Sequence, residues 1–570
     1  MKKVCLKLLL LSAVFFLPLT AEAKNINLLI VPFDASDGGQ YSDMRDSIQT
    51  MLISRLASHS GVNVLDNGMS AVQLEQLAGG KKFKGIGKKN DETYLVTGSL
   101  FQMKGGVKVQ VNLLPIINGG LDHDTSPLSF SALSRQDGSL ISDMAELARN
   151  INTGAFEEQR SVSMDTEEKN GMGAFVTRHP EEAWKRGQYS SLAAITGSKG
   201  FSAKNVGARS HFDFEDKLLG LQVVDADGDG TREVFLFFSD RIEVRQFLSR
   251  RLSPVNACSL PSGLRVHAWN FADLNRDGVQ SLYLSATRGL KPESSVLSWS
   301  KQKGFAWKKK NIPFYIRPVI LPGRGMTLLA QRRGLAKIAL RRPGVFISSF
   351  DSKGDVQLGE RLPLPKSVNL FDFEYADLDG DNTAELVAIG GHNHLKVFSG
   401  ANDLLYVSEK LYGGSRLYLG PTQGEATDKQ SRTSFSVEED ADRELLYMPG
   451  RILVADFNGD GHKEIVVAQS SMPSLGLFTR LRLFNSGTIT GLTWNGESFI
   501  PFWETGSFRG YLSDFAMTLR KGKGETQIGT LYVSNLPSSG TLLSLLPGTK
   551  ESTLTVGRID FSSEKESDQK

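Results

Sequence analysis

The stretch "VVDADGDGTREVFLFF", residues 223–238, decides the fold, because an acidic turn leads directly into an apolar strand. Asp225, Asp227 and Asp229 alternate through the turn, a glycine follows, and Glu233 stands immediately before the apolar run. Carboxylates held this close repel one another unless a cation or hydrogen-bond donors compensate their charge. The stretch therefore predicts a cation-binding turn between two strands.

The spacing of the oxygen atoms favours calcium. Counting from Asp225, acidic side chains occupy positions 1, 3, 5 and 9, glycine at position 6 allows a sharp turn, and Thr231 at position 7 offers a carbonyl. An EF-hand begins in the same way but requires glutamate at position 12 between helices, whereas this chain has Leu236 within a predicted strand. We therefore predict a structural calcium ion (Ca2+) in a β-hairpin loop, with no catalytic role.

The motif recurs, with first aspartates at positions 225, 273, 377 and 456. Ser281 replaces the last acid in loop two, so we expect weak or no binding there. The alternative is that all four are aspartate–glycine turns stabilised by hydrogen bonds from side chain to backbone. The candidate ligands are Asp225, Asp227, Asp229, Glu233 and the Thr231 carbonyl in loop one; Asp273, Asn275 and Asp277 in loop two; Asp377, Asp379, Asp381, Glu385 and the Thr383 carbonyl in loop three; and Asp456, Asn458, Asp460, Glu464 and the His462 carbonyl in loop four.

The spacing of the loops predicts an all-β propeller. Gaps of 48, 104 and 79 residues fit a repeat of about 50 residues if 319–331 is an acid-free member and 422–445 is an insert. A sixth member at 515–533 carries a basic loop. Six blades are favoured, and a seventh could form if strands near 211–214 and 552–560 pair to close the ring.

Residues 206–560 resemble the FG-GAP or VCBS repeats of integrin α-subunit propellers and of exported bacterial proteins. The four acidic loops between strands carry this resemblance. It implies calcium that stabilises the blades, without an open coordination position for a substrate.

The first residues predict export. A basic start, an apolar run from Leu8 to Leu19 and the sequence Ala21-Glu22-Ala23 are typical of a secretory signal peptide over residues 1–23. The alternative, a membrane anchor, is disfavoured because the run is short, and no later stretch is apolar enough to span a bilayer. We expect a mature chain in the periplasm, at the outer membrane or outside the cell. Cys258 is then its one cysteine, so no internal disulfide is expected.

Residues 24–155 predict an α/β domain. Apolar runs suited to strands alternate with helical periodicity, and 94–116 reads as a hairpin. The runs LLIVPFDA and YLVTGSLFQMKGGVKVQVNLL resemble the amino-terminal domain family of TolB and the related FlgO-type domains, which implies an interaction domain of the cell envelope. Residues 156–205 are predicted to be a linker and 561–570 a disordered tail.

Two further motifs have competing interpretations. The histidines of GHNHLKV, residues 391–397, could bind a metal, although such residues more often lie on an exposed turn. The tryptophans of the repeats could line a sugar-binding groove or fill the blade cores.

Charge and missing motifs limit the function. The signal removes three lysines and one glutamate from 66 basic and 63 acidic residues, leaving a net charge near +1. That balance argues against general nucleic-acid binding. No P-loop, G-x-S-x-G or H-E-x-x-H motif occurs. We predict a non-catalytic binding or scaffold protein whose partner is another envelope protein or a surface glycan. The alternatives are a propeller-type polysaccharide lyase or hydrolase and an accessory subunit of an outer-membrane or flagellum-associated assembly.

Overall fold

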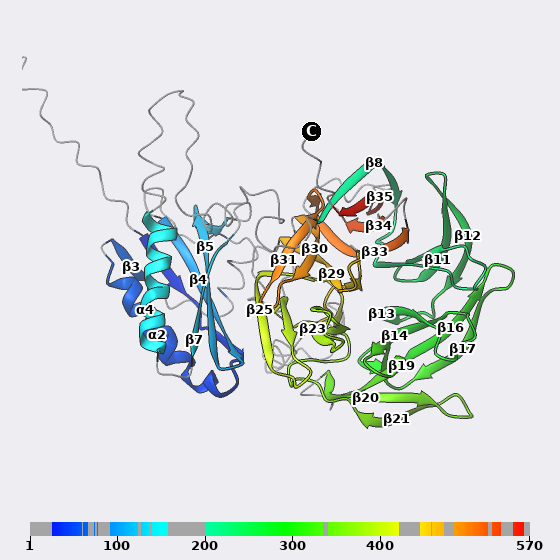
Figure 1. Cartoon of the computed structure of the whole chain (residues 1–570), viewed down its shortest axis with the longest axis horizontal. Coiled ribbons are helices and arrows are strands. Elements are labelled where there is room, and N and C mark those ends of the chain that lie inside the picture. Colours follow the sequence, from blue (N-terminus) through cyan, green and yellow to red (C-terminus); the bar gives the residue numbers. More distant parts are fainter. Residues whose placement is uncertain are drawn as a thin grey trace, which may run out of the picture.

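The computed structural model has two parts, an α/β domain and a β-propeller (Figure 1). No helix among its described residues is long and apolar enough to cross a membrane. The structure describes residues 26–59, 61–65, 73, 77, 82, 92–122, 127–135, 139–157, 201–334, 340–390, 392–420, 445–457, 459–471, 484, 486–521, 527–536 and 551–563.

The α/β domain is built on one mixed sheet of order β3-β1-β4-β5-β6, with β2 on β4 and β7 on β5. Strand β1 is parallel to both of its neighbours, and β4 and β5 form the predicted antiparallel hairpin. Its elements are β1 (Ile26–Ile30), β2 (Asp34–Asp37), η1 (Gly39–Met44), α2 (Arg45–Ala57), β3 (Val62–Leu65), β4 (Glu92–Met103), β5 (Gly106–Ile117), β6 (Gly120–Leu121), β7 (Leu128–Arg135), α4 (Leu140–Ile151) and η2 (Asn152–Glu157).

Helices α2 and α4 cover one face of this sheet, and the propeller lies on the opposite side (Figure 1). Helix α4 buries Met144, Leu147, Ala148 and Ile151, which share one helical face. Strands β4 and β5 are buried along most of their length, as expected for a sheet covered on both faces. The sequence also predicts a helix at 70–80, but most of that segment lies outside the described residues.

The propeller consists of six sheets around a common centre (Figure 1). This confirms the favoured blade number. In chain order, the blades are β9 (Gly220–Val224), β10 (Glu233–Phe237), β11 (Arg241–Leu248) and β12 (Arg251–Ser259); β13 (Leu264–Ala272), β14 (Ser281–Arg288), β15 (Lys291–Pro292), β16 (Ser294–Ser300) and β17 (Gly304–Ile312); β18 (Tyr315–Leu321), β19 (Gly325–Arg333), β20 (Arg341–Phe350) and β21 (Val356–Arg361); β22 (Phe373–Ala376), β23 (Glu385–Ile389), β24 (His394–Phe398) and β25 (Leu404–Leu411); β28 (Ile452–Ala455), β29 (Glu464–Ser471), β30 (Ser486–Trp494), β31 (Phe499–Glu504) and β32 (Phe508–Arg509); and β33 (Tyr511–Lys521), β34 (Gln527–Leu536), β35 (Ser552–Ser563) and β8 (Phe201–Phe214).

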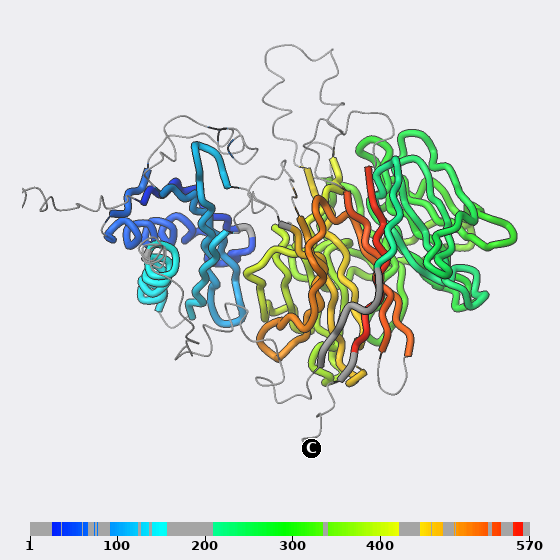
Figure 2. The backbone as a smooth tube through the Cα atoms, turned by 90° about the horizontal axis from the view of Figure 1, so that it is seen from above, coloured from blue at the N-terminus to red at the C-terminus, as the bar shows by residue number. Residues whose placement is uncertain are grey.

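The last blade closes the ring by joining distant parts of the chain (Figure 2). Strand β8 pairs with β35 in antiparallel register, with Phe214 opposite Ser552 and His211 opposite Thr555. The pairing considered for a seventh blade therefore exists, but it completes the sixth, because β35 also pairs with β34.

The strand limits also shift the expected boundaries. Strand β8 begins at Phe201, five residues inside the expected linker, and β35 continues to Ser563, inside the expected tail. These extensions pair with each other, an arrangement that the local sequence does not reveal. The remainder of both expected segments, 158–200 and 564–570, lies outside the described residues. A small extra sheet of β26 (Tyr418–Leu419) and β27 (Leu446–Tyr447) flanks the insert, which also lies mostly outside them.

The α/β domain packs against the outer strand of blade four. Side chains of β5 donate hydrogen bonds to carbonyl groups of β25: Lys108 Nζ to Val407 at 2.9 Å and Gln110 Nε2 to Glu409 at 3.0 Å. Phe101 of β4 lies in the same apolar cluster as Leu404 and Val407. The α/β domain therefore covers a sheet edge whose carbonyl groups would otherwise be unpaired.

His394 of the two-histidine motif is buried beneath this contact, so the interpretation as an exposed turn was wrong for this residue. Its ring meets Phe101 edge-on at 5.1 Å between centroids, and its Nδ1 lies 2.9 Å from the Ser408 carbonyl oxygen. Burial lowers the pKa of His394 to about 3, so the imidazole is uncharged at neutral pH. The ring thus serves packing between the domains.

Charged groups complete the domain contact. Lys396 Nζ forms an ion pair with Asp37 of β2, and both side chains are largely buried. His392 Nε2 lies 3.2 Å from an oxygen of Asp34. Removing one partner of a buried ion pair is costly because the other charge remains desolvated. These contacts therefore fix where the α/β domain sits on blade four.

Candidate functional site

The first aspartate of each acidic loop organises the turn. In loop one, Asp225 Oδ1 accepts a hydrogen bond from Gly228 N and Oδ2 accepts one from Gly230 N, both at 2.9 Å. Asp377 and Asp456 accept the equivalent pairs in loops three and four. The backbone thus folds around one carboxylate in the same way in these three loops. In loop two, Asp273 accepts hydrogen bonds from Asp277 N at 3.1 Å and Gly278 N at 2.8 Å.

The residue at position 6 adopts the left-handed conformation that this turn requires. Its φ is 86° at Gly230, 85° at Gly278, 66° at Asn382 and 97° at Gly461. Asparagine tolerates this region better than other residues with a side chain, which explains Asn382 in loop three. The sharp turn predicted at position 6 is confirmed.

The aspartate at position 5 accepts a hydrogen bond from the backbone two residues later. Asp229 Oδ1 takes the N–H of Thr231 at 2.7 Å, Asp381 that of Thr383 at 2.6 Å, and Asp460 that of His462 at 2.8 Å. These bonds are the ones expected of aspartate–glycine turns. A carboxylate oxygen has a second lone pair, so the bonds are also compatible with a bound cation.

The glutamate at position 9 reaches back beneath the loop. Glu233 is 1% exposed, and its Oε2 accepts a hydrogen bond from Ala226 N at 3.4 Å. The pKa of Glu233 is raised to about 7, mainly by burial and also by the charges of the three loop aspartates, while the hydrogen bond from Ala226 N acts in the opposite direction. Burial also raises the pKa of Glu385. Both glutamates therefore lie where a negative charge is unfavourable without a cation.

Two of the loops bring three acids to one point. Oxygens of Asp225, Asp227 and Asp229 lie within 4.8 Å of one another, and so do oxygens of Asp377, Asp379 and Glu385. In loop one, Asp227 Oδ2 accepts a hydrogen bond from Lys301 N at 2.8 Å. Its buried Oδ1 has no hydrogen-bond partner in the described part of the chain. An unpaired carboxylate oxygen beside two others fits a hard cation such as calcium.

Loop two lacks a complete acidic set and obtains positive charge from a side chain instead. Ser281 replaces the final glutamate, and its Oγ accepts a hydrogen bond from Lys308 Nζ at 2.9 Å. Asn275 Nδ2 donates to Asp277 Oδ2 at 2.7 Å. Bonds from Val279 N–H and Asn275 lower the pKa of Asp277, and the charge of Lys308 lowers it further. Loop two therefore has its own means of compensating the acids.

Loops of neighbouring blades contact one another on one face of the ring. The carbonyl oxygen of Ala226 in loop one accepts a hydrogen bond from Gln280 N in loop two at 3.1 Å. The carbonyl oxygen of Asp377 in loop three accepts one from Lys463 N in loop four at 3.1 Å. The repeat alone does not reveal these links, which join the loops in pairs.

The residues predicted in loop four are only partly placed. Glu464 Oε2 accepts a hydrogen bond from Phe457 N at 2.7 Å, the arrangement also found for the glutamates of loops one and three. Asn458 lies outside the described residues. The His462 side chain is exposed but lies against loop three, where a Cβ on Gly380 would be 2.9 Å from its ring. Glycine at that position therefore allows the two loops to approach.

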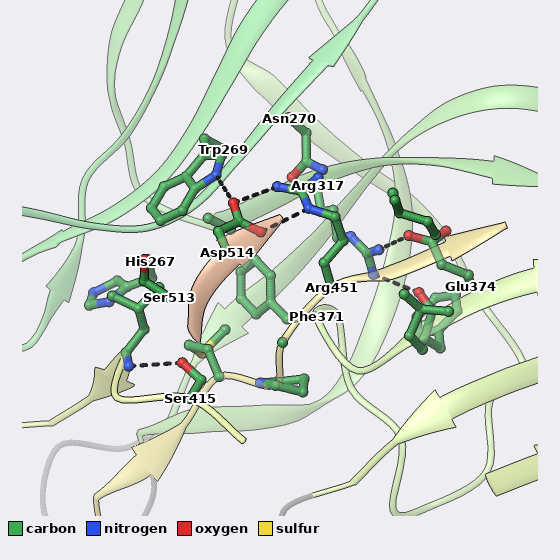
Figure 3. A pocket seen from close by; sticks show the side chains of 18 residues that line it. His267, Trp269, Asn270, Arg317, Phe371, Glu374, Ser415, Arg451, Ser513 and Asp514 are labelled. Carbon is green, nitrogen blue, oxygen red and sulfur yellow. Dashed lines mark hydrogen bonds and ion pairs between the residues drawn. The ribbon is translucent and has the colours of Figure 1, made fainter. Parts of the chain in front are cut away.

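The centre of the ring contains a second polar cluster, which sequence reasoning did not identify (Figure 3). Asp514 of blade six accepts hydrogen bonds from Arg451, from Trp269 Nε1 at 3.2 Å and from Leu221 N at 3.0 Å. The donors belong to blades five, two and one. One carboxylate thus joins four blades around a cavity of about 190 Å³.

Arg317 and His267 face the same cavity (Figure 3). Arg317 forms an ion pair with Glu374 and donates to the carbonyl oxygen of Phe373 at 2.7 Å, linking blades three and four. His267 Nε2 lies 2.8 Å from Thr287 Oγ1, and burial lowers the pKa of this histidine to about 3. Interactions within the protein thus hold both side chains in place, Arg317 through blade four and His267 through Thr287. Charged residues within otherwise apolar inner strands were the sequence feature that could have indicated this polar cluster.

The tryptophans belong mainly to the blade cores. Trp269, Trp299 and Trp503 are each no more than 6% exposed, and Trp269 stacks on Phe237 at 4.9 Å between centroids. Their burial confirms the interpretation as core residues and removes these three from a surface sugar-binding groove.

The fold and these sites define the class as a six-bladed β-propeller carrying an α/β domain. No family model and no curated protein matches the chain. Among solved structures it is similar to TolB from Acinetobacter baumannii, with 11% identity, a TM-score of 0.24 and coverage of 95% of this chain and 94% of that one. It is also similar to BBS1N in a complex with ARL6DN, with 10% identity, a TM-score of 0.30 and coverage of 63% and 98%. The Dos1 propeller has 10% identity, a TM-score of 0.26 and coverage of 63% and 74%. These similarities are too distant to indicate a function.

Proposed function

We propose that the chain is an exported binding or scaffold protein of the bacterial envelope whose propeller is stabilised by calcium. The observation that carries the calcium proposal is the convergence of Asp225, Asp227 and Asp229 with one buried oxygen that has no partner among the described residues. The analogous group in loop three supports it. Calcium would neutralise charge in these turns and would perform no chemistry.

The proposed binding role rests on the arrangement of the two domains. Hydrogen bonds, the Lys396–Asp37 ion pair and the packing of Phe101 hold the α/β domain on blade four. Asp514, Arg451, Arg317 and Glu374 in the channel are engaged with one another or with the backbone. A rigid ring that presents many loops suits recognition, and this arrangement favours binding over the alternative of a lyase or hydrolase.

A pull-down from envelope fractions tests the binding role. The full mature chain is used as bait in millimolar calcium and in chelator, because extracellular modules often bind calcium at only about 0.1–1 mM. We expect a reproducible envelope protein or glycan partner that is captured better with calcium. Hydrolysis or elimination of a glycan from a panel would replace this proposal with the enzymatic alternative. Capture of a defined outer-membrane or flagellar assembly would support the accessory-subunit alternative.

The proposed export has its own test. Amino-terminal sequencing of the protein isolated from its native source is expected to give a chain that begins at Lys24, outside the cytoplasm. Recovery of an intact Met1 or of the apolar segment in the purified protein would contradict export by a cleaved signal peptide.

A further inference from the structure

Blade three and the outer strand of blade two carry a strong local excess of positive charge. Residues 301–350 contain twelve lysines and arginines and no aspartate or glutamate. This segment forms β17 through β20. The nearly balanced charge of the whole chain therefore conceals a basic region beside the acidic loops.

A groove lies within this region, between blades two and three. Its volume is about 520 Å³, within the range usual for ligand sites. Tyr283, Val296, Leu328 and Phe350 provide apolar and aromatic lining, and Ser348 and Ser349 add hydroxyl groups. The groove can thus accept an apolar side chain and hydrogen-bond a neighbouring polar group.

Two consecutive lysines line the groove because strand β17 contains a β-bulge. Val296 pairs with Lys309 and Leu297 with Trp307, so Lys308 is an extra residue between them. A bulge changes the normal alternation of side chains along a strand. As a result, both Lys308 and Lys309 line the groove.

The lysines retain capacity for an external anion. Lys308 Nζ donates to Ser281 Oγ at 2.9 Å, and an ammonium group has three donors. Lys309 Nζ forms an ion pair with Asp355 at 2.6 Å, with the two side chains 29% and 59% exposed, and it also donates to the Lys353 carbonyl oxygen at 3.4 Å. Exposed ion pairs are weak and exchange readily with other charged partners. The charge of Lys308 also lowers the pKa of Asp277 in loop two, and the charge of Lys309 lowers that of Asp351.

The tip of blade three adds an apolar surface at the same place. Ile320 and Met326 are cross-strand partners on either side of the acid-free turn and are 63% and 37% exposed. Met326 also lines the groove. In blades one, two, four and five the corresponding turn is acidic. Three features therefore occur together around one groove: the acid-free turn of blade three, the serine at position 281, and the adjacent lysines Lys308 and Lys309.

From this arrangement we propose that the groove and the tip of blade three bind an extended segment of a partner protein that combines acidic and apolar side chains. Acidic side chains would meet Lys308 and Lys309, and apolar ones would cover Ile320, Met326 and the groove lining. This inference rests on the proposed binding function and names the class of partner.

The surroundings of the groove favour a short acidic segment over a continuous polyanion. Loop two, with Asp273 and Asp277, borders the groove through Leu274 and Asn275. Loop one adjoins loop two, since a Cβ on Gly228 would lie 3.1 Å from the carbonyl oxygen of Gly278. A nucleic acid or an anionic bilayer would bring negative charge against these acids. A peptide can confine its acids to the groove.

A peptide array in which acidic and apolar content vary independently tests the proposal with the full mature chain. We expect enrichment of peptides that contain both kinds of residue, and weaker binding as salt rises. In fluorescence anisotropy with an enriched peptide, Lys308→Glu with Lys309→Glu should weaken binding about tenfold or more. Ile320→Ser with Met326→Ser should weaken it through loss of apolar contact.

Matched controls separate the site from general effects. Lys291→Glu with Lys366→Glu reverses two exposed charges, one in β15 and one between β21 and β22. Ile141→Ser with Leu248→Ser removes two exposed apolar side chains elsewhere. Both controls should bind like the parent, and melting curves check that every variant folds. Absence of enrichment, equal loss in the controls, or equally tight binding to phosphatidylglycerol vesicles or single-stranded DNA would overturn the proposal. If the pull-down still captures a partner, the proposed binding role remains supported even though this groove is not the binding site. The two experiments therefore distinguish failure of the groove proposal from failure of the binding role.

Discussion

Loops one and two form similar turns, but the negative charge of their acidic side chains is compensated differently. In both loops, the first aspartate accepts a hydrogen bond from the N–H of the glycine at position 6, which is Gly230 or Gly278. The aspartate at position 5 accepts one from the backbone N–H of the residue at position 7. Loop one ends in a buried glutamate, whereas loop two ends in Ser281 beside Lys308. The comparison teaches that backbone hydrogen bonds specify the turn, while charge compensation is a separate requirement with more than one solution.

Removal of calcium should produce the largest effect, because it acts on every loop with a complete acidic set. An ion that binds only the folded state stabilises it by roughly 2.7 kcal/mol per site at a concentration about 100 times the dissociation constant. Melting curves of the mature protein in millimolar calcium and in chelator measure the difference, and metal analysis counts bound ions. Identical curves together with no bound ion would mean that the loops are aspartate–glycine turns stabilised by hydrogen bonds alone.

The second-largest effect on stability should be the pH dependence that arises from loop one. Burial raises the pKa of Glu233 from 4.5 to about 7, so the folded protein binds this proton more tightly than the unfolded chain does. In calcium-free buffer, its contribution to stability is therefore present at low pH and is lost as pH rises between these values, by on the order of 2 kcal/mol. Glu233→Gln should reduce that loss at pH 8.

In calcium, Glu233→Gln should instead lower the stability of the folded protein, because it removes a candidate ligand. Melting at pH 5 and pH 8, with calcium and with chelator, measures both effects, and Glu497→Gln on an exposed turn is the control. If Glu233→Gln shifts stability equally under all four conditions, Glu233 neither titrates in this range nor contributes to a cation site.

Aspartates of loops one and two should differ in calcium. Asp227→Ala removes an oxygen from the convergent group of loop one, and we expect a loss of about 1.5 kcal/mol in calcium. In chelator, only the smaller part due to the lost hydrogen bond from Lys301 N should remain. Asp277→Ala removes hydrogen bonds from Val279 and Asn275, and we expect a smaller loss that is the same in either buffer. Chemical denaturation with and without calcium measures both. Equal calcium dependence of the two variants would remove the distinction between the loops.

The smallest effect should come from converting loop two. Ser281→Glu combined with Lys308→Met restores the acid at position 9 and removes the neighbouring ammonium group. We expect a gain of about 1 kcal/mol in calcium that chelator abolishes. Calcium titration of the melting temperature checks it, with Lys308→Met alone as the control. Failure of the double variant to gain calcium dependence would mean that more than charge distinguishes loop two.

The sequence predicted most of the fold because local patterns repeat. The acidic loops, the period of about 50 residues and the acid-free member at 319–331 predicted six blades, and the amino-terminal alternation predicted the α/β domain. These features depend on neighbouring residues, which a single sequence displays. The turn at Asn382 is an example, since its left-handed conformation follows from the loop pattern.

What sequence reasoning missed depends on contacts between distant residues. Lys308 follows Ser281 by 27 residues, and Asp514 follows Arg451 by 63. The burial of His394 involves Phe101, which the α/β domain brings over its ring. No local pattern specifies which side chains a closed ring will bring together. Only the three-dimensional structure therefore reveals the ammonium group beside loop two, the polar cluster at the centre of the ring and the contact between the domains.

The pairing of β8 with β35 has a consequence for synthesis. His211 and Thr555, which are 344 residues apart, hydrogen-bond to each other across this pair. During translation the first strand of the ring must therefore wait for the last, while blades one to five emerge without their closing neighbour. Strands left with open edges are prone to misassembly. A chain that ends shortly before residue 552 would thus keep open strand edges and be sensitive to protease and to chaperones, whereas the full chain can complete the ring.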